Sequence, residues 1–162
     1  MKFAESIESG PHANLAKFAG EWSGTTKTWF EPDVVADESP MTGTIKVILG
    51  GRFLMYEYAG SLQGKPFDGV AIFGFDIATN KFQMAWVDSF HMSTGIMFSE
   101  GEAGDKFSAF GTYFTGPETP RWGWRTELEL VDDDNIVIRA YNVEPDSDDQ
   151  IATETRYTRK AE

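Results

Sequence analysis

"FAGEWSG", residues 18–24, is the stretch that decides the fold. A short helical pattern over residues 11–20 ends there, and alternating, strand-like sequence begins. Gly20 lets the chain bend, and Trp22 is bulky enough to fill the floor of a β-barrel. We therefore predict a short N-terminal helix that plugs one end of a barrel whose first strand carries this indole.

Downstream of the helix, short apolar segments alternate with turn sequences. Because no connection is long enough for a crossover helix, the strands must be antiparallel, and closure would remove the exposed edges of so many strands. We predict an all-β fold, a single up-and-down antiparallel β-barrel in one domain, residues 1–162, with a lead-in over 1–20 and the barrel over 21–160. A two-sheet sandwich is the alternative. The expected strands are 22–31, 42–49, 52–61, 67–75, 81–90, 93–102, 106–115, 121–131, 136–143 and 150–159, with a loop at 32–40.

Composition excludes several classes of function. The chain of 162 residues carries a net charge of -12, so it would be repelled by nucleic acid and by anionic membrane surfaces. Its lack of cysteine excludes disulfides, thiolate metal sites and a cysteine nucleophile. With neither a leader nor an apolar span in the sequence, we expect a cytoplasmic protein.

Four longer stretches carry a resemblance to a known family: "GEWSGTTKTWFEP", "LGGRFLMYEY", "GKPFDGVAIFGFD" and "WVDSFHMSTGIM". In this order they resemble the bacterial domain-of-unknown-function family 1579, and the Gly-x-Trp after a short helix is similar to the opening of lipocalin and calycin barrels. The resemblance implies a lipocalin-like barrel in which a basic residue of the last strand packs across Trp22. Arg159 is our choice for that residue, and Arg156 is the alternative.

Alternation along the strands predicts which side chains face the interior. A barrel of this size either fills itself with side chains or holds one small ligand, and the aromatic character of the predicted inner face favours a pocket for an apolar molecule. In the strand over 93–102, we place Thr94 on one face with Ile96 and Phe98. The residues expected to bind the ligand are Arg52, Phe73, Met84, Trp86, Asp88, Thr94, Trp122 and Trp124.

Three of the polar residues admit more than one role. Arg52 would bind a ligand carboxylate or pair with an acidic neighbour. Asp88 would have a raised pKa if it were buried without hydrogen bonds, but an aspartate at a strand end more often caps a turn, and we favour that role. His91 lies in a polar turn, where a surface position is more common than ligation of haem or a metal. We therefore predict no cofactor, no metal and no catalytic residue.

Three functions remain open from the sequence. The first is a binding protein for a small hydrophobic or aromatic molecule, which we favour. The second is an enzyme that works inside the barrel with Asp88 as acid or base. The third is a structural or interaction protein whose barrel is filled. No nucleic acid or membrane partner is expected, and a homodimer is left open.

Overall fold

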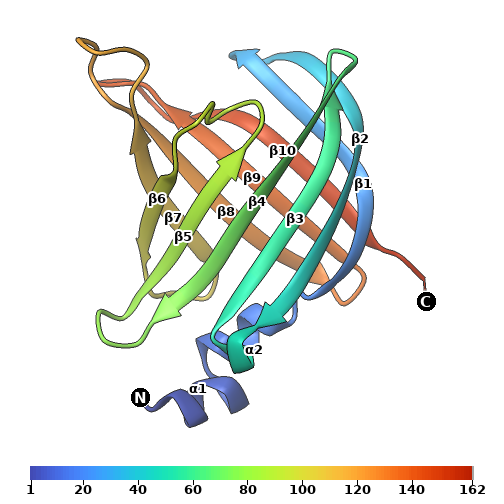
Figure 1. Cartoon of the computed structure of the whole chain (residues 1–162), viewed down its shortest axis with the longest axis vertical. Coiled ribbons are helices and arrows are strands. Elements are labelled where there is room, and N and C mark those ends of the chain that lie inside the picture. The colour runs from blue at the N-terminus through green and yellow to red at the C-terminus, as the bar shows by residue number, and fades with distance from the viewer. Residues whose placement is uncertain (162) are drawn as a thin grey trace.

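The computed structural model describes residues 1–161, which form a closed barrel of ten strands with two short helices at one end (Figure 1). Each strand pairs antiparallel with its neighbours in the sequence, and the last pairs with the first. The predicted up-and-down barrel is confirmed, and the two-sheet alternative is wrong. The elements are α1 (Phe3–Ser9), α2 (Pro11–Ala16), β1 (Gly20–Glu31), β2 (Val34–Ile48), the single 3-10 turn η1 (Leu49–Gly51), β3 (Phe53–Leu62), β4 (Lys65–Asp76), β5 (Lys81–Asp88), β6 (Met97–Glu102), β7 (Phe107–Tyr113), β8 (Trp122–Asp132), β9 (Asn135–Val143) and β10 (Gln150–Arg159).

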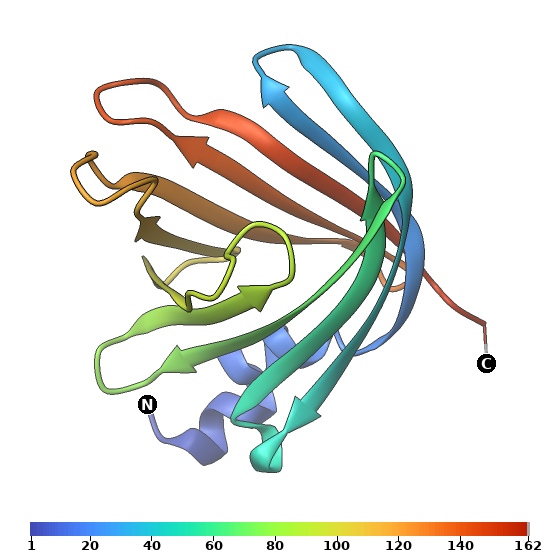
Figure 2. The ribbon, with the colours of Figure 1, turned by 45° about the horizontal axis from the view of Figure 1, so that its top comes forward.

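The two ends of the barrel differ. Figure 2 brings the end opposite the helices toward the viewer, and the helices lie at the far end. We call the helix-covered end the closed end and the opposite one the open end. The turns from β2 to β3 and from β4 to β5 are at the closed end, whereas the segment from β5 to β6 is at the open end.

The N-terminal half departs from the predicted elements in two places. Residues 32–40, expected as a loop, mostly belong to β2, because a tight turn with Asp33 at a φ of 61° reverses the chain at once. The helix predicted within residues 11–20 is α2, and a second helix, α1, which was not predicted, precedes it and is separated from it by the extended Gly10.

The strand predicted over 93–102 begins only at Met97, and its assumed faces were wrong. Met97 pairs with Trp86, which turns Met97 and Ser99 inward. Ile96 and Phe98 are therefore outside, with 71% and 67% of their surfaces exposed. The shift arises because the segment before Met97 is held as a folded loop and cannot extend the strand.

The closed end is filled around Trp22, which has no exposed surface. Its Nε1–H donates to the carbonyl of Phe18 at 3.0 Å, and the Arg159 guanidinium carbon lies 4.3 Å from its ring centroid. The expected partner of Trp22 is thus confirmed as Arg159. A Cβ on Gly20, which has a φ of 155°, would lie 2.2 Å from the Arg159 Nη1 atom, so a side chain at this position would displace the guanidinium from Trp22.

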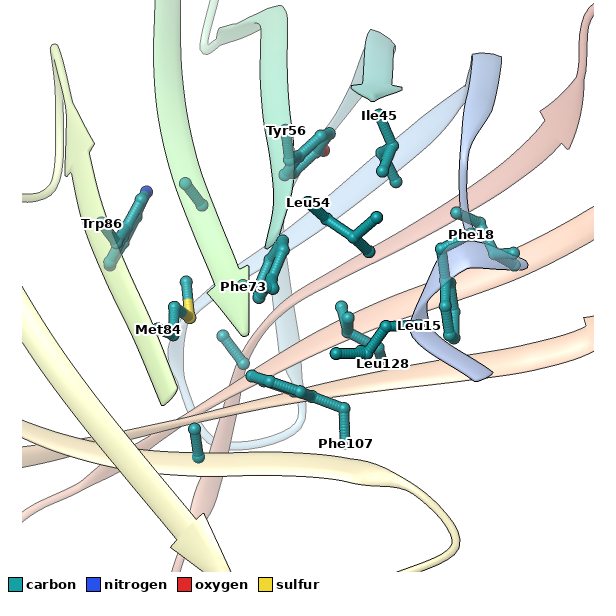
Figure 3. Packing of buried hydrophobic residues seen from close by; sticks show 14 of the residues in the cluster. Leu15, Phe18, Ile45, Leu54, Tyr56, Phe73, Met84, Trp86, Phe107 and Leu128 are labelled. Atoms are coloured by element: carbon teal, nitrogen blue, oxygen red, sulfur yellow. The ribbon is translucent and has the colours of Figure 1, made fainter. Parts of the chain in front are cut away.

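The apolar core runs from the helices along the inside of the barrel. Figure 3 shows Leu15 and Phe18 beside Leu128 at one end of this cluster and Trp86 at the other. Buried aromatic rings pack edge to face along it, for example Phe73 on Phe107 with centroids 5.2 Å apart. The core therefore leads from the closed end up to the candidate site.

Candidate functional site

The barrel interior contains two adjoining cavities. The inner cavity has a volume of about 70 Å³, and the outer cavity, toward the open end, has a volume of about 230 Å³. Both are lined by Trp86, His91, Trp124 and Thr153, so they meet at these residues. The other residues of the inner cavity are Thr26, Met41, Tyr56, Tyr58, Phe67, Ala71, Phe73, Met84, Thr126, Ile138, Ala140 and Thr155, and those of the outer cavity are Thr28, Trp29, Phe30, Phe90, Met92, Met97, Tyr113, Asn142 and Ala152.

One wall of the inner cavity comes from β3, β4 and β5 and is mainly aromatic. Its polar atoms are bonded within the protein: the hydroxyls of Tyr56 and Tyr157 lie 2.6 Å apart, and Trp86 Nε1–H donates to the Tyr58 hydroxyl at 2.7 Å. Burial raises the pKa of Tyr56, and burial together with the nearby Asp88 carboxylate raises the pKa of Tyr58. Both phenols therefore stay neutral at physiological pH.

The opposite wall carries threonines from β1, β8 and β10. Thr26 and Thr155 face each other across the β1–β10 pair, and their hydroxyls satisfy one another at 2.7 Å. The Thr126 hydroxyl is different, because it is buried and has no hydrogen-bond partner within residues 1–161. An unpaired buried hydroxyl costs free energy, so this one is available to a molecule in the cavity.

The loop between β5 and β6, residues 89–96, is organised by Asp88. One carboxylate oxygen accepts the backbone N–H groups of Phe90 at 3.2 Å and Met92 at 2.8 Å, and the other is bonded to His91 Nδ1. The Asp88 side chain has no exposed surface. Burial by itself would raise the pKa of Asp88, but the hydrogen bonds from His91 and the two amides outweigh it and lower that pKa.

His91 completes a cluster of flat rings where the two cavities meet. Trp86 and Trp124 stack with centroids 5.4 Å apart and planes at 24°. The His91 ring lies 5.5 Å from Trp86 and 5.8 Å from Trp124. We call Trp86, His91 and Trp124 the ring cluster. The parts of these rings that line the cavities offer stacking surface to a planar molecule.

The structure brings together only part of the predicted site. Phe73, Met84, Trp86 and Trp124 line the inner cavity. Asp88 caps the loop at their edge, as favoured from the sequence, and lines neither internal cavity.

Three predicted residues lie elsewhere. Arg52 is at the closed end, where its guanidinium covers the Phe3 ring at 4.5 Å and donates to the Leu49 carbonyl. Thr94 is exposed in the loop after β5, and Trp122, at the start of β8, lines neither internal cavity. The alternation of side chains fixes the face of a strand, but it does not tell which end of the barrel a residue reaches.

Several lining residues were not found from the sequence. His91 was expected on the surface, but its side chain is only 19% exposed and lines both cavities. The available signal was the spacing Asp88-x-x-His91 after a strand, which lets the carboxylate reach the imidazole. Trp29 and Thr126 had no signal beyond strand alternation.

Charge is sparse around both cavities. Within residues 1–161, neither cavity is lined by lysine or arginine, and His91 is the sole titratable side chain there besides tyrosines. In that same part of the chain, no group of three or more histidine and carboxylate side chains could hold a metal ion. The site is suited to a ligand that is largely uncharged.

Fold and site together define a closed antiparallel β-barrel with a helical plug at one end and an aromatic-lined cavity at the other. The chain belongs to the family described as "Protein of unknown function (DUF1579)", which it matches over residues 8–159. A search of curated proteins finds no sequence match.

Solved structures share the fold at low sequence identity. Rv2717c from M. tuberculosis is 14% identical, with a TM-score of 0.60 over 93% of this chain and 98% of that one. The S-type phycobiliprotein lyase CPES from Guillardia theta is 8% identical, with a TM-score of 0.55 over 100% of this chain and 94% of that one. A de novo designed fluorescence-activating β-barrel is 13% identical, with a TM-score of 0.47 over 92% of this chain and 98% of that one.

Neither α1 nor α2, nor any other helix of residues 1–161, has the length and apolarity that crossing a membrane requires.

Proposed function

We propose that the protein binds a small, planar, hydrophobic or aromatic molecule inside the barrel, entering from the open end. The observation that carries the proposal is that the interior stays open around the ring cluster, although the closed end is filled. Ligand sites are typically apolar concavities with a few polar groups, and this one combines flat rings with His91 and Thr126.

The two cavities suggest how the ligand would lie. The outer cavity of about 230 Å³ has room for the body of the molecule, against the ring cluster. The inner cavity of about 70 Å³ would take a narrow end, next to the unpaired Thr126 hydroxyl. A polar atom at that end would satisfy the hydroxyl and so contribute to affinity.

The enzyme alternative, with Asp88 as acid or base, has less support. Both carboxylate oxygens of Asp88 are engaged by the loop, and its lowered pKa keeps it ionised rather than ready to donate a proton. An ionised carboxylate bonded in this way holds His91 and the loop backbone in position. The filled-barrel alternative is disfavoured by the same cavities that support binding.

Binding is tested by equilibrium dialysis of the protein against 2-methoxynaphthalene, an uncharged two-ring probe. Ala152 is buried and lines the outer cavity, so the Ala152→Phe variant fills the proposed site. Ala78→Phe, in the exposed turn after β4, is the matched control. We expect saturable binding that Ala152→Phe abolishes and Ala78→Phe preserves. The proposal would be contradicted if the protein bound neither 2-methoxynaphthalene nor its hydroxyl analogue. It would also be contradicted if the two variants bound the probe equally well.

A further inference from the structure

We infer that the site selects neutral aromatic molecules that carry a hydrogen-bond donor, of which a phenol is the simplest, with the donor placed on His91 Nε2. This inference rests on the proposed function and names its ligand class. It depends on three features of the site: the bonding of the His91 ring, the lack of a lysine or arginine among the cavity-lining residues of the described chain, and the flat walls around the ring.

The bonding of His91 fixes what the ring offers to a ligand. Its Nδ1 faces the ionised Asp88 carboxylate, which can only accept, so Nδ1 carries the proton. With one proton on the ring, the remaining nitrogen, Nε2, is an acceptor, and this is the form in which we infer that the ligand is bound. Within residues 1–161, no protein group bonds to Nε2, although the ring lines both cavities. An acceptor of this kind is complementary to an O–H or N–H donor.

The charge around His91 disfavours anionic ligands. A carboxylate placed in the outer cavity would approach the buried Asp88 anion in a protein of net charge -12. Within the described residues 1–161, no lysine or arginine lines either cavity to neutralise it. Desolvating an unpaired anion is expensive, whereas a neutral phenol loses little on entering an aromatic cavity. A ligand carboxylate, one of the roles left open for Arg52 from the sequence, is therefore not the class that this site fits.

The remaining walls require a flat molecule. The indoles of Trp86 and Trp124 flank His91, and Tyr113 lies beside Trp124 with its hydroxyl donated to Asn142 at 2.7 Å. A ring stacked against these indoles would carry its substituents in the plane of the ring. His91 is then the polar contact that distinguishes one planar molecule from another.

The inference is tested with three ligands of similar shape: 2-naphthol, 2-methoxynaphthalene and 2-naphthoate. We expect 2-naphthol to bind about tenfold more tightly than 2-methoxynaphthalene, as the gain of one buried hydrogen bond implies, and 2-naphthoate to bind most weakly. If 2-methoxynaphthalene binds as tightly as 2-naphthol, or if 2-naphthoate binds best, the inference fails while the proposed function stands. If none binds, the proposed function itself fails.

Two variants locate the selectivity on His91. His91→Phe keeps a ring among Trp86 and Trp124 but removes the acceptor, so the preference for 2-naphthol should disappear while 2-methoxynaphthalene still binds. Tyr141→Phe removes a hydroxyl from a ring that lies against Arg125 and lines neither cavity, so it is the matched control, which should retain the preference. A preference that survives in His91→Phe contradicts the inference.

Asp88 acts here as a positioning residue, and its role has a spectroscopic signature. In the wild-type protein, ¹⁵N NMR of His91 should show a protonated Nδ1 and an unprotonated Nε2. Asp88→Asn, which can also donate to the ring, should shift the proton toward Nε2 and weaken 2-naphthol binding more than 2-methoxynaphthalene binding. An unchanged tautomer in Asp88→Asn, or a protonated Nε2 in the wild type, would overturn the assignment.

Discussion

The closed and open ends of the barrel use the same residue types in opposite ways. At the closed end, Trp22 is fully buried, its N–H is bonded and its face is covered by Arg159. At the open end, Trp86 and Trp124 border empty space, and His91 beside them has one nitrogen without a protein partner among residues 1–161. The difference teaches that an indole in a barrel is structural where packing covers its faces and is available for binding where it borders a cavity.

The largest difference in stability between the two ends should appear when a tryptophan of each end is replaced by alanine. Trp22→Ala would remove a fully packed side chain, and we expect it to lower the free energy of unfolding by about 3–5 kcal/mol. Trp124→Ala enlarges a cavity that already exists, so we expect about half that loss. Urea unfolding measures both. Equal losses would mean that the open end is packed as tightly as the closed end.

The Gly20–Arg159 approach at the closed end should be sensitive to a single methyl group. Gly20→Ala places a Cβ 2.2 Å from Arg159 Nη1, which displaces the guanidinium from Trp22, and we expect a loss of about 1–3 kcal/mol. Gly104→Ala is the control, since its Cβ would meet nothing within 4 Å. Thermal unfolding compares the stability of the two variants. If Gly20→Ala were as stable as Gly104→Ala, Arg159 would not be closely packed against Gly20.

Asp88 should make the stability of the open end depend on pH. Its pKa is lowered in the folded protein, because the hydrogen bonds from the loop outweigh burial. The carboxylate thus stabilises the fold above its unfolded pKa, about 3.9, and this contribution is lost as the pH falls through the folded value. We expect Asp88→Asn to cost about 1–2 kcal/mol at neutral pH.

The wild-type advantage over Asp88→Asn should then shrink as the pH falls below about 4, the usual range of aspartate. Urea unfolding of both proteins at several pH values gives this difference. An advantage that grows as the pH falls would mean that burial dominates and the carboxyl is protonated in the fold.

The smallest effects should come from two threonines of one wall. Thr155→Val leaves the Thr26 hydroxyl without its partner and should cost about 1 kcal/mol. Thr126→Val removes a hydroxyl that has no partner within residues 1–161, so stability should stay within about 0.5 kcal/mol or rise. The affinity for a ligand with a polar inner end should fall. Calorimetry gives both quantities. Destabilisation by Thr126→Val would reveal a role for its hydroxyl in the free protein.

The closed end was predictable because its signals are local in the sequence. Gly20 and Trp22 lie next to the end of the helical pattern, and the resemblance implied Arg159 as the partner of Trp22. The barrel itself followed from the succession of short strands and turns. Residue types and spacing are sufficient where the structure depends on neighbours along the chain.

The open end was harder to predict because it depends on positions along the barrel axis. Arg52 and Trp86 were both expected in the pocket, yet Arg52 lies at the opposite end of the barrel. Thr94 was misplaced because Asp88 folds the loop before β6, and a backbone hydrogen-bond pattern of that kind leaves no periodic signal. The placement of His91 at the cavities was missed for the same reason, because it also depends on the loop that Asp88 folds.

The most direct test of the account follows the tryptophan indole N–H signals during a titration with 2-naphthol. The chain has 5 tryptophans, so ¹H–¹⁵N spectra resolve the two ends in a single experiment. We predict that the signals of Trp86 and Trp124 shift with saturation while that of Trp22 stays in place. A shift of the Trp22 signal without one at Trp86 or Trp124 would contradict the assignment of binding to the open end.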